Sequence, residues 1–323
     1  HQCDRRQRQM CIRDSIVHRV VHGGTKYRHA ALLDLEVKQF IRDMIPLART
    51  HHPASLACIE EISEHFPEIP QAVVFDTSFH QTLPEYAWRY ALPRKISDQY
   101  AIRRYGFHGI SHQSVVKQAA SFLKTPVNKL NLITIHLGNG ASISAIKKGI
   151  CVDTTMVMTP LEGLMMGTRP GDLDPGILTL LAREGWNQET LETMLNQDSG
   201  MKGLCGTNDF REILQNKEEG NEEAEMALEL YCYRVRKTIG SFSTVIGPVD
   251  ALVFTGGVGE NVPSVRKRSV RGMEWMNIQL DTDMNDQAEA PCAIHSKDSQ
   301  TKILVLPSEE EWEMASQAAE LIL

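Results

Sequence analysis

Several features that would place this chain in a special class are missing from its sequence. It has no apolar run near the roughly 18 residues that cross a bilayer, so we expect no membrane segment. Its 34 basic residues are outnumbered by 41 acidic ones, and the net charge is -7. Nucleic-acid and anionic-membrane binders favour basic surfaces. The sequence therefore predicts neither kind of partner.

The seven cysteines are scattered, and no two of them form a C-x-x-C pair. This spacing argues against a zinc ribbon or a redox motif, and reduced thiols are typical of a cytoplasmic enzyme. A chain of 323 residues with 42% hydrophobic residues predicts about two domains and a core that needs no disulfide. Residues 1–15 carry four arginines and lack the apolar centre of a signal peptide. We interpret them as a cloning scar or a disordered arm.

From Ile16 onward, short β-branched runs alternate with helical patterns, which predicts an α/β fold. Strands are expected at residues 17–21, 72–75, 132–137, 142–146, 251–255 and 303–306. Helices are expected at residues 34–47, 55–65, 111–123, 176–183, 188–196, 210–215, 224–246, 264–276 and 310–321. The sequence has no long linker, and we expect the domain boundary just after residues 75–80.

Three glycine-containing turns form the strongest functional pattern. The first joins two apolar strands through His136, Leu137, Gly138, Asn139 and Gly140. Asn-Gly is typical of a hairpin turn, but the second glycine would also let an anion approach the backbone. This turn is therefore either a structural hairpin or a phosphate loop.

The second turn runs from Thr255 to Asn261, after an apolar strand and before a helix opened by Pro263. Unpaired N–H groups between a strand and a helix predict an anion site, although neither the Walker pattern nor the dinucleotide fingerprint matches. The third turn, residues 167–175, encloses Arg169 with two glycines and two prolines. It predicts a phosphoryl or carboxylate site, or else a surface turn with an ion pair.

Two charged residues belong with these turns. Arg19 lies in a strand that leads into Gly23 and Gly24, and Asp76 directly follows another apolar strand. The carboxyl ends of strands are where α/β sheets hold their ligands, which favours a functional role for Asp76. Helix capping is the alternative for this residue.

Together these segments resemble the acetate kinases and related short-chain acyl kinases. The resemblance covers Ile16 to Leu323. It is carried by HRVVHGG from His18, VFDTSFH from Val74, YGFHGISH from Tyr105, HLGNGAS from His136, TPLEGLMMGTRPGDLDP from Thr159, GTNDFREI from Gly206, FTGGVGEN from Phe254 and LPSEEE from Leu306. It implies the two-domain α/β, ribonuclease H-like fold of sugar kinases, actin and the Hsp70 ATPase, with the domains closing over ATP.

The resemblance also implies a domain plan, substrates and partners. Residues 16–78 with 308–323 would form the N-terminal domain, and residues 79–307 the nucleotide-binding domain. The implied activity is reversible phosphoryl transfer from ATP to acetate, which gives ADP and acetyl phosphate. The implied cofactor is Mg²⁺, and the implied assembly is a homodimer.

Individual roles follow from the resemblance residue by residue. The implied catalytic residues are Asp76, His108 and Arg169. Arg19 would hold the acyl carboxylate, and the acyl pocket would be lined by Val21, Phe107 and Pro160. The implied nucleotide-binding residues are His136, Leu137, Gly138, Asn139, Gly140, Asp209, Phe210, Arg211, Gly257, Val258, Gly259, Glu260 and Asn261. Glu310 would be the magnesium-linked glutamate, and the helix that follows it should return to residues 16–76.

One part of the family pattern is missing from this sequence. Family members have an apolar strand and an Asn-x-Gly-Ser-Ser-Ser-x-Lys-like loop ahead of HRVVHGG, and nothing of that kind precedes Ile16. The resemblance therefore implies that the first domain is truncated. Two alternatives stay open: a propionate or butyrate kinase, because one methylene changes specificity by about 1–3 kcal/mol, and a non-catalytic nucleotide-binding fragment.

Overall fold

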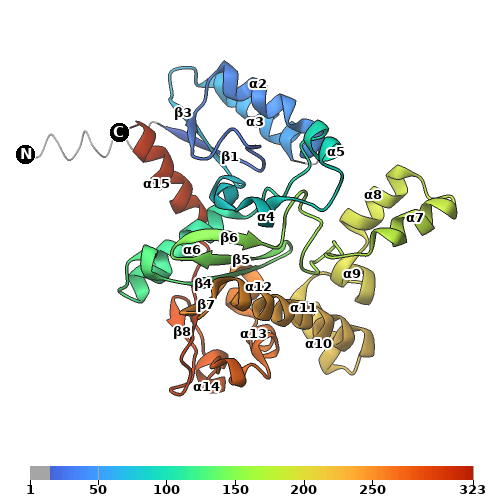
Figure 1. Ribbon diagram of the computed structural model, residues 1–323, viewed down its shortest axis with the longest axis vertical. Coiled ribbons are helices and arrows are strands. Elements are labelled where there is room, and N and C mark those ends of the chain that lie inside the picture. Colours follow the sequence, from blue (N-terminus) through green and yellow to red (C-terminus); the bar gives the residue numbers. More distant parts are fainter. Residues whose placement is uncertain (1–14, 50, 323) are drawn as a thin grey trace, which may run out of the picture. The chain divides into compact units, whose positions relative to one another are not determined.

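The computed structural model describes residues 15–49 and 51–322. The chain forms two compact units (Figure 1). Unit 1 contains the described residues up to Gln81, together with Tyr105–Ser114 and residues 309–322. Unit 2 contains Thr82–Arg104 and Val115–Ser308. In the described part of the chain, no helix is long and apolar enough to cross a membrane.

Unit 1 is built on a three-stranded sheet with the order β1-β3-β2. The strands are β1 (Ile16–Val20), β2 (Ala31–Leu32) and β3 (Gln71–Phe75). Strands β1 and β3 are parallel, with Val20 opposite Phe75, so both end at the same edge of the sheet. Its helices are α2 (Leu35–Asp43), η1 (Ile45–Leu47), α3 (His52–His65), α15 (Glu310–Ile322), and the parts of η2 (Ser78–Thr82) and α6 (Gly109–Phe122) that lie in this unit.

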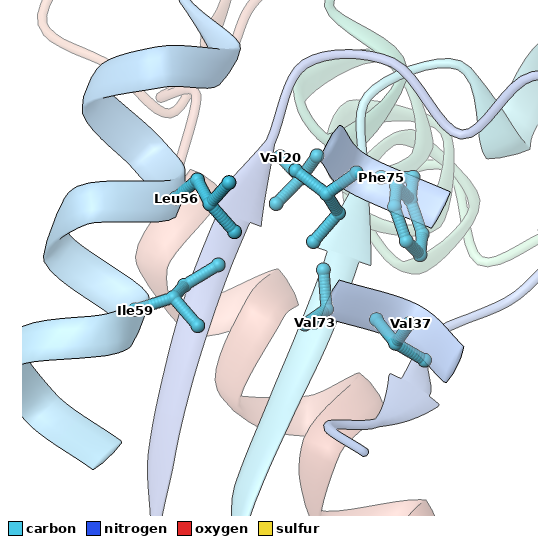
Figure 2. Close-up of a cluster of buried hydrophobic side chains, with 7 residues drawn as sticks. Val20, Val37, Leu56, Ile59, Val73 and Phe75 are labelled. Carbon is cyan, nitrogen blue, oxygen red and sulfur yellow. The ribbon is translucent and has the colours of Figure 1, made fainter. Parts of the chain in front are cut away.

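The core of unit 1 lies where α2 and α3 cover the sheet. Helix α2 begins at Asp34, whose carboxylate accepts a hydrogen bond from the Val37 N–H at 2.8 Å. Val37 and Ile41 are one turn apart and are both buried. Figure 2 shows the side chains that meet there, contributed by both strands and both helices, namely Val20, Val37, Leu56, Ile59, Val73 and Phe75.

Helix α15 returns to the sheet of unit 1, where it contacts β1, β2 and β3. This confirms the expectation that the chain after Glu310 comes back to residues 16–76. The expected helix over residues 34–47 is wrong at its end. It stops at Asp43, and the short helix η1 follows with Pro46 as its second residue, because proline lacks the N–H that would continue the α-helix.

Unit 2 is built on a six-stranded mixed sheet with the order β6-β5-β4-β7-β9-β8. Its strands are β4 (Leu132–Leu137), β5 (Ala141–Lys147), β6 (Ile150–Thr154), β7 (Ala251–Thr255), β8 (Cys292–Ala293) and β9 (Lys302–Val305). Strands β4, β7 and β9 are parallel neighbours, so the loops after β4 and β7 leave from one edge. The expected hairpin over residues 132–146 is confirmed by the antiparallel pairing of β4 with β5.

The helices of unit 2 include one long member, α11 (Glu222–Ile246), which contacts β4, β5 and β6. Asn221 caps its N-terminus, and three glutamates in its first turn complement the helix dipole. The others are α4 (Glu85–Trp88), α5 (Arg94–Gln99), η3 (Val127–Lys129), α7 (Pro175–Arg183), α8 (Gln188–Gln197), α9 (Gly200–Cys205), α10 (Phe210–Glu218), α12 (Gly256–Asn261), α13 (Pro263–Val270), η4 (Glu274–Met276) and α14 (Thr282–Asp286).

Candidate functional site

The carboxyl edge of the unit 1 sheet carries a cluster of three charged side chains. The Arg19 Nε and Nη2 groups donate to Asp76 Oδ2 at 3.2 and 2.6 Å. Arg19 Nη1 lies 3.0 Å from Glu310 Oε2. Because β1 and β3 are parallel and α15 begins at this edge, residues from three distant parts of the chain meet around one guanidinium. Three of the residues that the family resemblance implies are thus in direct contact.

The environment of this cluster is partly closed to solvent. The Arg19 side chain is 40% exposed, that of Glu310 20% and that of Asp76 2%. Burial raises the pKa of Asp76, and the adjacent Arg19 guanidinium opposes that shift. Burial also raises the pKa of Glu310, with Arg19 again lowering it and the Asp76 carboxylate adding to the rise. The ion pair with Arg19 accords with the active-site interpretation of Asp76, and a backbone hydrogen bond from Ile110, in the first turn of α6, accords with the capping one.

The cluster has the chemistry of a magnesium site. Asp76 Oδ1 is buried and has no hydrogen-bond partner. Together with Glu310 it offers hard oxygen donors, and Mg²⁺ commonly takes one or two carboxylates and completes its shell with water and phosphate. Among residues 15–49 and 51–322 no group of three or more histidine, cysteine or acidic side chains could hold a metal by itself. The residues therefore fit an Mg²⁺ ion that arrives with a phosphate ligand.

The implied acyl-pocket and catalytic residues of unit 1 flank this cluster: Val21 is two residues after Arg19, and Phe107 and His108 precede Gly109, whose N–H donates to the Asp76 carbonyl at 2.9 Å. Val21 directly follows β1 and is half-buried. Phe107 is 2% exposed, and its ring lies 5.8 Å from that of the buried His22. His108 has a φ of 56°, a left-handed conformation that is costly for a side chain other than glycine. Such strained residues cluster at functional sites, which supports His108 as a candidate site residue.

In unit 2, Asn139 joins two of the implied nucleotide segments and the loop of Arg169. The turn after β4 is closed by the Gly138 N–H, which donates to the Gly140 carbonyl at 2.9 Å. The Asn139 carbonyl accepts from the Gly167 N–H at 3.0 Å, and its Oδ1 accepts from Asn208 Nδ2 at 2.8 Å. Asn208 immediately precedes Asp209. The structure therefore brings residues 136–140, 167 and 208–211 together.

The adenosine-contacting segment implied by the resemblance forms the start of α10. Asp209 caps this helix by accepting from the Arg211 N–H at 2.9 Å, and Arg211 also pairs with its carboxylate at 2.6 Å. The hydrogen bonds from Arg211 lower the pKa of Asp209 to about 2. Phe210 is buried, with its ring 5.2 Å from Tyr231. Its ring is thus part of the core of unit 2.

Arg169 lies on the rigid loop that the sequence singled out. Its Nη1 donates to the Pro160 carbonyl at 2.6 Å, so two residues implied to act in the site are in contact. Burial lowers the pKa of Arg169. Within the described residues no carboxylate pairs with its guanidinium, which leaves donors for a ligand oxyanion. Among the residues that the structure describes, Arg169 thus forms no ion pair of the kind that the surface-turn alternative expects.

The segment from Gly256 to Asn261 corrects the sequence prediction, because it is helix α12 and not an open loop. Gly256 has a φ of 78°, and a Cβ there would lie 2.7 Å from the Leu137 carbonyl oxygen. Glycine thus lets α12 start directly against the end of β4. The Glu260 carboxylate accepts from the Gly256 N–H at 2.9 Å. Val258 and Gly259 are buried, so they support the helix from inside.

Sequence reasoning missed two residues of this region. Asn208 could have been found, because it lies beside Asp209 in a segment that the resemblance already covered. Nothing in the sequence pointed to Arg266 on α13, because an arginine in a helix is usually exposed. Its side chain is fully buried and contacts α12.

Comparison with known proteins agrees with these observations. A profile described as the acetokinase family matches residues 2–316. An acetate kinase from Sulfurovum sp. (strain NBC37-1) is 50% identical over 312 residues, which are 96% of this chain and 79% of the relative. The crystal structure of Porphyromonas gingivalis acetate kinase superposes with a TM-score of 0.92 at 42% identity, over 96% of this chain and 78% of that one. A propionate kinase structure from Francisella tularensis gives 0.90 at 38% identity, over 98% and 83%. The expected α/β fold is thereby confirmed.

Proposed function

The chain belongs to the acetokinase family, and we propose that it catalyses the reversible transfer of the γ-phosphoryl group of ATP to acetate. The observation that carries this proposal is the cluster of Arg19, Asp76 and Glu310. The cluster places the Arg19 guanidinium, which can bind a carboxylate, beside two carboxylates that are suited to Mg²⁺. These are the groups that an acyl-phosphate reaction needs on its acceptor side.

In the proposed reaction a carboxylate oxygen of acetate forms a bond to the γ-phosphorus of ATP. The bond from that phosphorus to the β,γ-bridging oxygen breaks, and ADP leaves with the electron pair. Acetate is already ionised near neutral pH, so no general base is required. Catalysis then depends on in-line positioning and on cationic cover for the transferring oxygens.

Arginine and histidine side chains would provide that cationic cover. In unit 1, Arg19 would hold the acetate carboxylate, with Val21 and Phe107 beside the methyl group and His108 near the phosphoryl group. In unit 2, Arg169 would pair with the phosphoryl oxygens, because its guanidinium is half-buried and has no carboxylate partner among the described residues. The segments 136–140, 209–211 and 257–261 would contact the nucleotide.

Mg²⁺ belongs to the proposal as the cofactor that neutralises phosphate charge when it is bound. The net charge of the Arg19, Asp76 and Glu310 cluster supports a bound Mg²⁺. Arg19 carries one positive charge against the carboxylates of Asp76 and Glu310, so the cluster has no surplus charge to offer a phosphate. Asp76 and Glu310 would hold the ion. A homodimer and a cytoplasmic location complete the proposal, and the five cysteines within the described residues are free, which supports a reducing compartment.

Propionate is the second candidate acceptor, because the propionate kinase structure superposes nearly as well as the acetate kinase one. The two acids differ by one methylene, which changes specificity by about 1–3 kcal/mol. The test is formation of acyl phosphate from ATP with acetate, propionate or butyrate, with Mg²⁺ or with EDTA. We expect the highest kcat/KM for acetate and no turnover in EDTA. ADP binding without acyl phosphate from any acid would favour the non-catalytic nucleotide-binding fragment.

A further inference from the structure

The most deeply buried charge of unit 2 is the guanidinium of Arg266. Its side chain is 0% exposed. Four hydrogen bonds hold it, to the Gly259 carbonyl at 2.9 Å, the Glu260 carbonyl at 2.7 Å, Asn285 Oδ1 at 2.9 Å and the Asn285 carbonyl at 2.9 Å. All four acceptors are uncharged. In the described part of the chain no carboxylate forms an ion pair with it.

An unpaired buried charge costs free energy, so buried arginines are normally neutralised by a carboxylate. Burial lowers the pKa of Arg266, and Asp286 and the Cys292 thiol oppose this shift. Asp286 is exposed, and its carboxylate accepts from Asn285 Nδ2 at 3.1 Å rather than from the guanidinium. Among the described residues the guanidinium therefore has no direct ion-pair partner, and Asp286 acts on its charge only from beyond Asn285.

The contacts of Arg266 explain how α12 can exist. Three of its six residues are glycine, and each glycine disfavours a helix by about 1 kcal/mol relative to alanine. The Arg266 Nη1 group bridges two carbonyls in the last turn of α12, where helix carbonyls have no partner within the helix. This bridge fixes the backbone of a segment that would otherwise favour an open loop.

We propose that Arg266 is a positioning residue for the phosphates of the nucleotide. It fixes α12 through two backbone carbonyls, and it places behind the helix a positive charge that forms no direct ion pair with a described residue. The inference rests on the proposed function, in which residues 257–261 contact the nucleotide. In a protein interior a charge acts over a longer range than in water, so the Arg266 charge would attract the phosphates of a nucleotide bound at residues 257–261.

Variants can distinguish the charge of Arg266 from its hydrogen bonds. Arg266→Lys keeps the charge and loses part of the hydrogen-bonding fork. Arg266→Gln loses the charge. Asn285→Asp keeps the Oδ1 acceptor for Arg266 and turns this contact into a direct ion pair. A purely structural role for Arg266 predicts that Asn285→Asp leaves the preference for phosphates unchanged.

The experiment is calorimetric titration of each protein with ADP and with adenosine, and the readout is the ratio of the two affinities. We expect Arg266→Gln and Asn285→Asp to lower this ratio about tenfold, and Arg266→Lys to stay within about threefold of the parent ratio. Hydrogen exchange at residues 257–261 should be faster in Arg266→Gln. The matched control is Arg236→Gln, because Arg236 also donates to two backbone carbonyls but lies 3.7 Å from the Glu229 carboxylate.

Failure of this inference can be told apart from failure of the proposed function. If the parent protein binds no ADP, the proposed function fails before any variant is considered. If the parent binds ADP and all variants keep its ratio, Arg266 has no electrostatic role and the inference is overturned. Thermal unfolding of each variant identifies one that does not fold. If Arg266→Gln or Asn285→Asp does not fold, the ratio of ADP to adenosine affinity in the other variant decides whether Arg266 has an electrostatic role.

Discussion

The Arg19 guanidinium on the first strand of unit 1 lies 3.0 Å from the Glu310 carboxylate at the start of the last helix. The same guanidinium donates two hydrogen bonds to the buried Asp76. Arg19 therefore fixes two carboxylates while 40% of its own side chain stays exposed. In the proposed function its exposed part would bind the substrate carboxylate, and Mg²⁺ would take up the charge of Asp76 and Glu310.

Replacing Arg169 with alanine should reduce kcat by about two orders of magnitude or more, because a preorganised charge donor to the transition state typically contributes about 10²–10³ in rate. The KM for ATP should change little. Arg169→Lys should restore part of the activity, since lysine lacks the planar fork. Steady-state kinetics measure both, with Arg183→Ala on α7 as the control. A near-normal kcat for Arg169→Ala would remove this residue from the mechanism.

Replacing Arg19 with alanine should raise the KM for acetate about tenfold or more, because a hydrogen bond to a charged group contributes about 1.5–3 kcal/mol. This rise should exceed the one caused by Arg169→Ala. The change also leaves the Asp76 carboxylate buried without its partner, so the Tm should fall. Adding Asp76→Asn should recover part of that Tm. If the KM for acetate is unchanged, Arg19 does not bind the acceptor.

Glu310→Gln tests the proposed magnesium ligand while it preserves side-chain size. The loss of one anionic oxygen should raise the Mg²⁺ concentration for half-maximal activity, because Mg²⁺ prefers carboxylate donors. Titration of activity with Mg²⁺ at fixed ATP gives this value. The control is Glu311→Gln, its neighbour on α15. Equal Mg²⁺ requirements in Glu310→Gln and in the parent would exclude Glu310 as a ligand.

The stability of unit 1 should fall as the pH drops below about 6.5. His18, His22, His52 and His80 are buried there, and burial lowers the pKa of each, that of His22 to about 3 and that of His80 to about 4. A histidine with a depressed folded pKa stabilises the fold above its unfolded pKa, and that contribution disappears as the pH falls. Asp76 acts in the opposite sense, because its raised pKa makes its contribution disappear as the pH rises.

Between about pH 7.5 and 5.5, the free energy of unfolding of unit 1 should decrease by about 1 kcal/mol for each strongly shifted histidine. Hydrogen exchange of the β3 amides as a function of pH, corrected for intrinsic rates, measures this slope locally. His80→Gln should reduce it, whereas the exposed His65→Gln serves as the control. A flat profile would contradict the buried neutral state of these histidines.

Gly167→Ala should weaken nucleotide binding without contacting the nucleotide. A Cβ at this position would lie 2.1 Å from Asn139 Oδ1, so Asn139 must move and lose its bonds to Gly167 and Asn208. We expect a higher Kd for ADP. The matched control is Gly240→Ala in α11, where a Cβ meets nothing within 4 Å and alanine favours the helix. Similar Kd values for both variants would show that Asn139 does not organise the site.

The parts of the fold that follow from local patterns were predictable. The hairpin of β4 and β5 and the long helix α11 have regular apolar spacing, and both are confirmed. The expected helix over residues 264–276 is wrong at its end. It stops at Val270, because the chain turns at Gly272 with a φ of 78°. The sequence did not predict strand β6. In the structure this strand follows a tight turn at Lys148 and Gly149, which both have a positive φ.

The sequence by itself determined the α/β class, the strand ends that carry charge and the candidate residues, because periodicity and motif order are local properties of the chain. The tertiary structure alone decided that Arg19 joins Asp76 to Glu310, and that Asn139 joins residues 167 and 208. It also decided that a glycine-rich segment forms helix α12. The physical reason is that Arg266 supplies hydrogen bonds from a different helix, and no local propensity encodes a partner that only folding brings into contact.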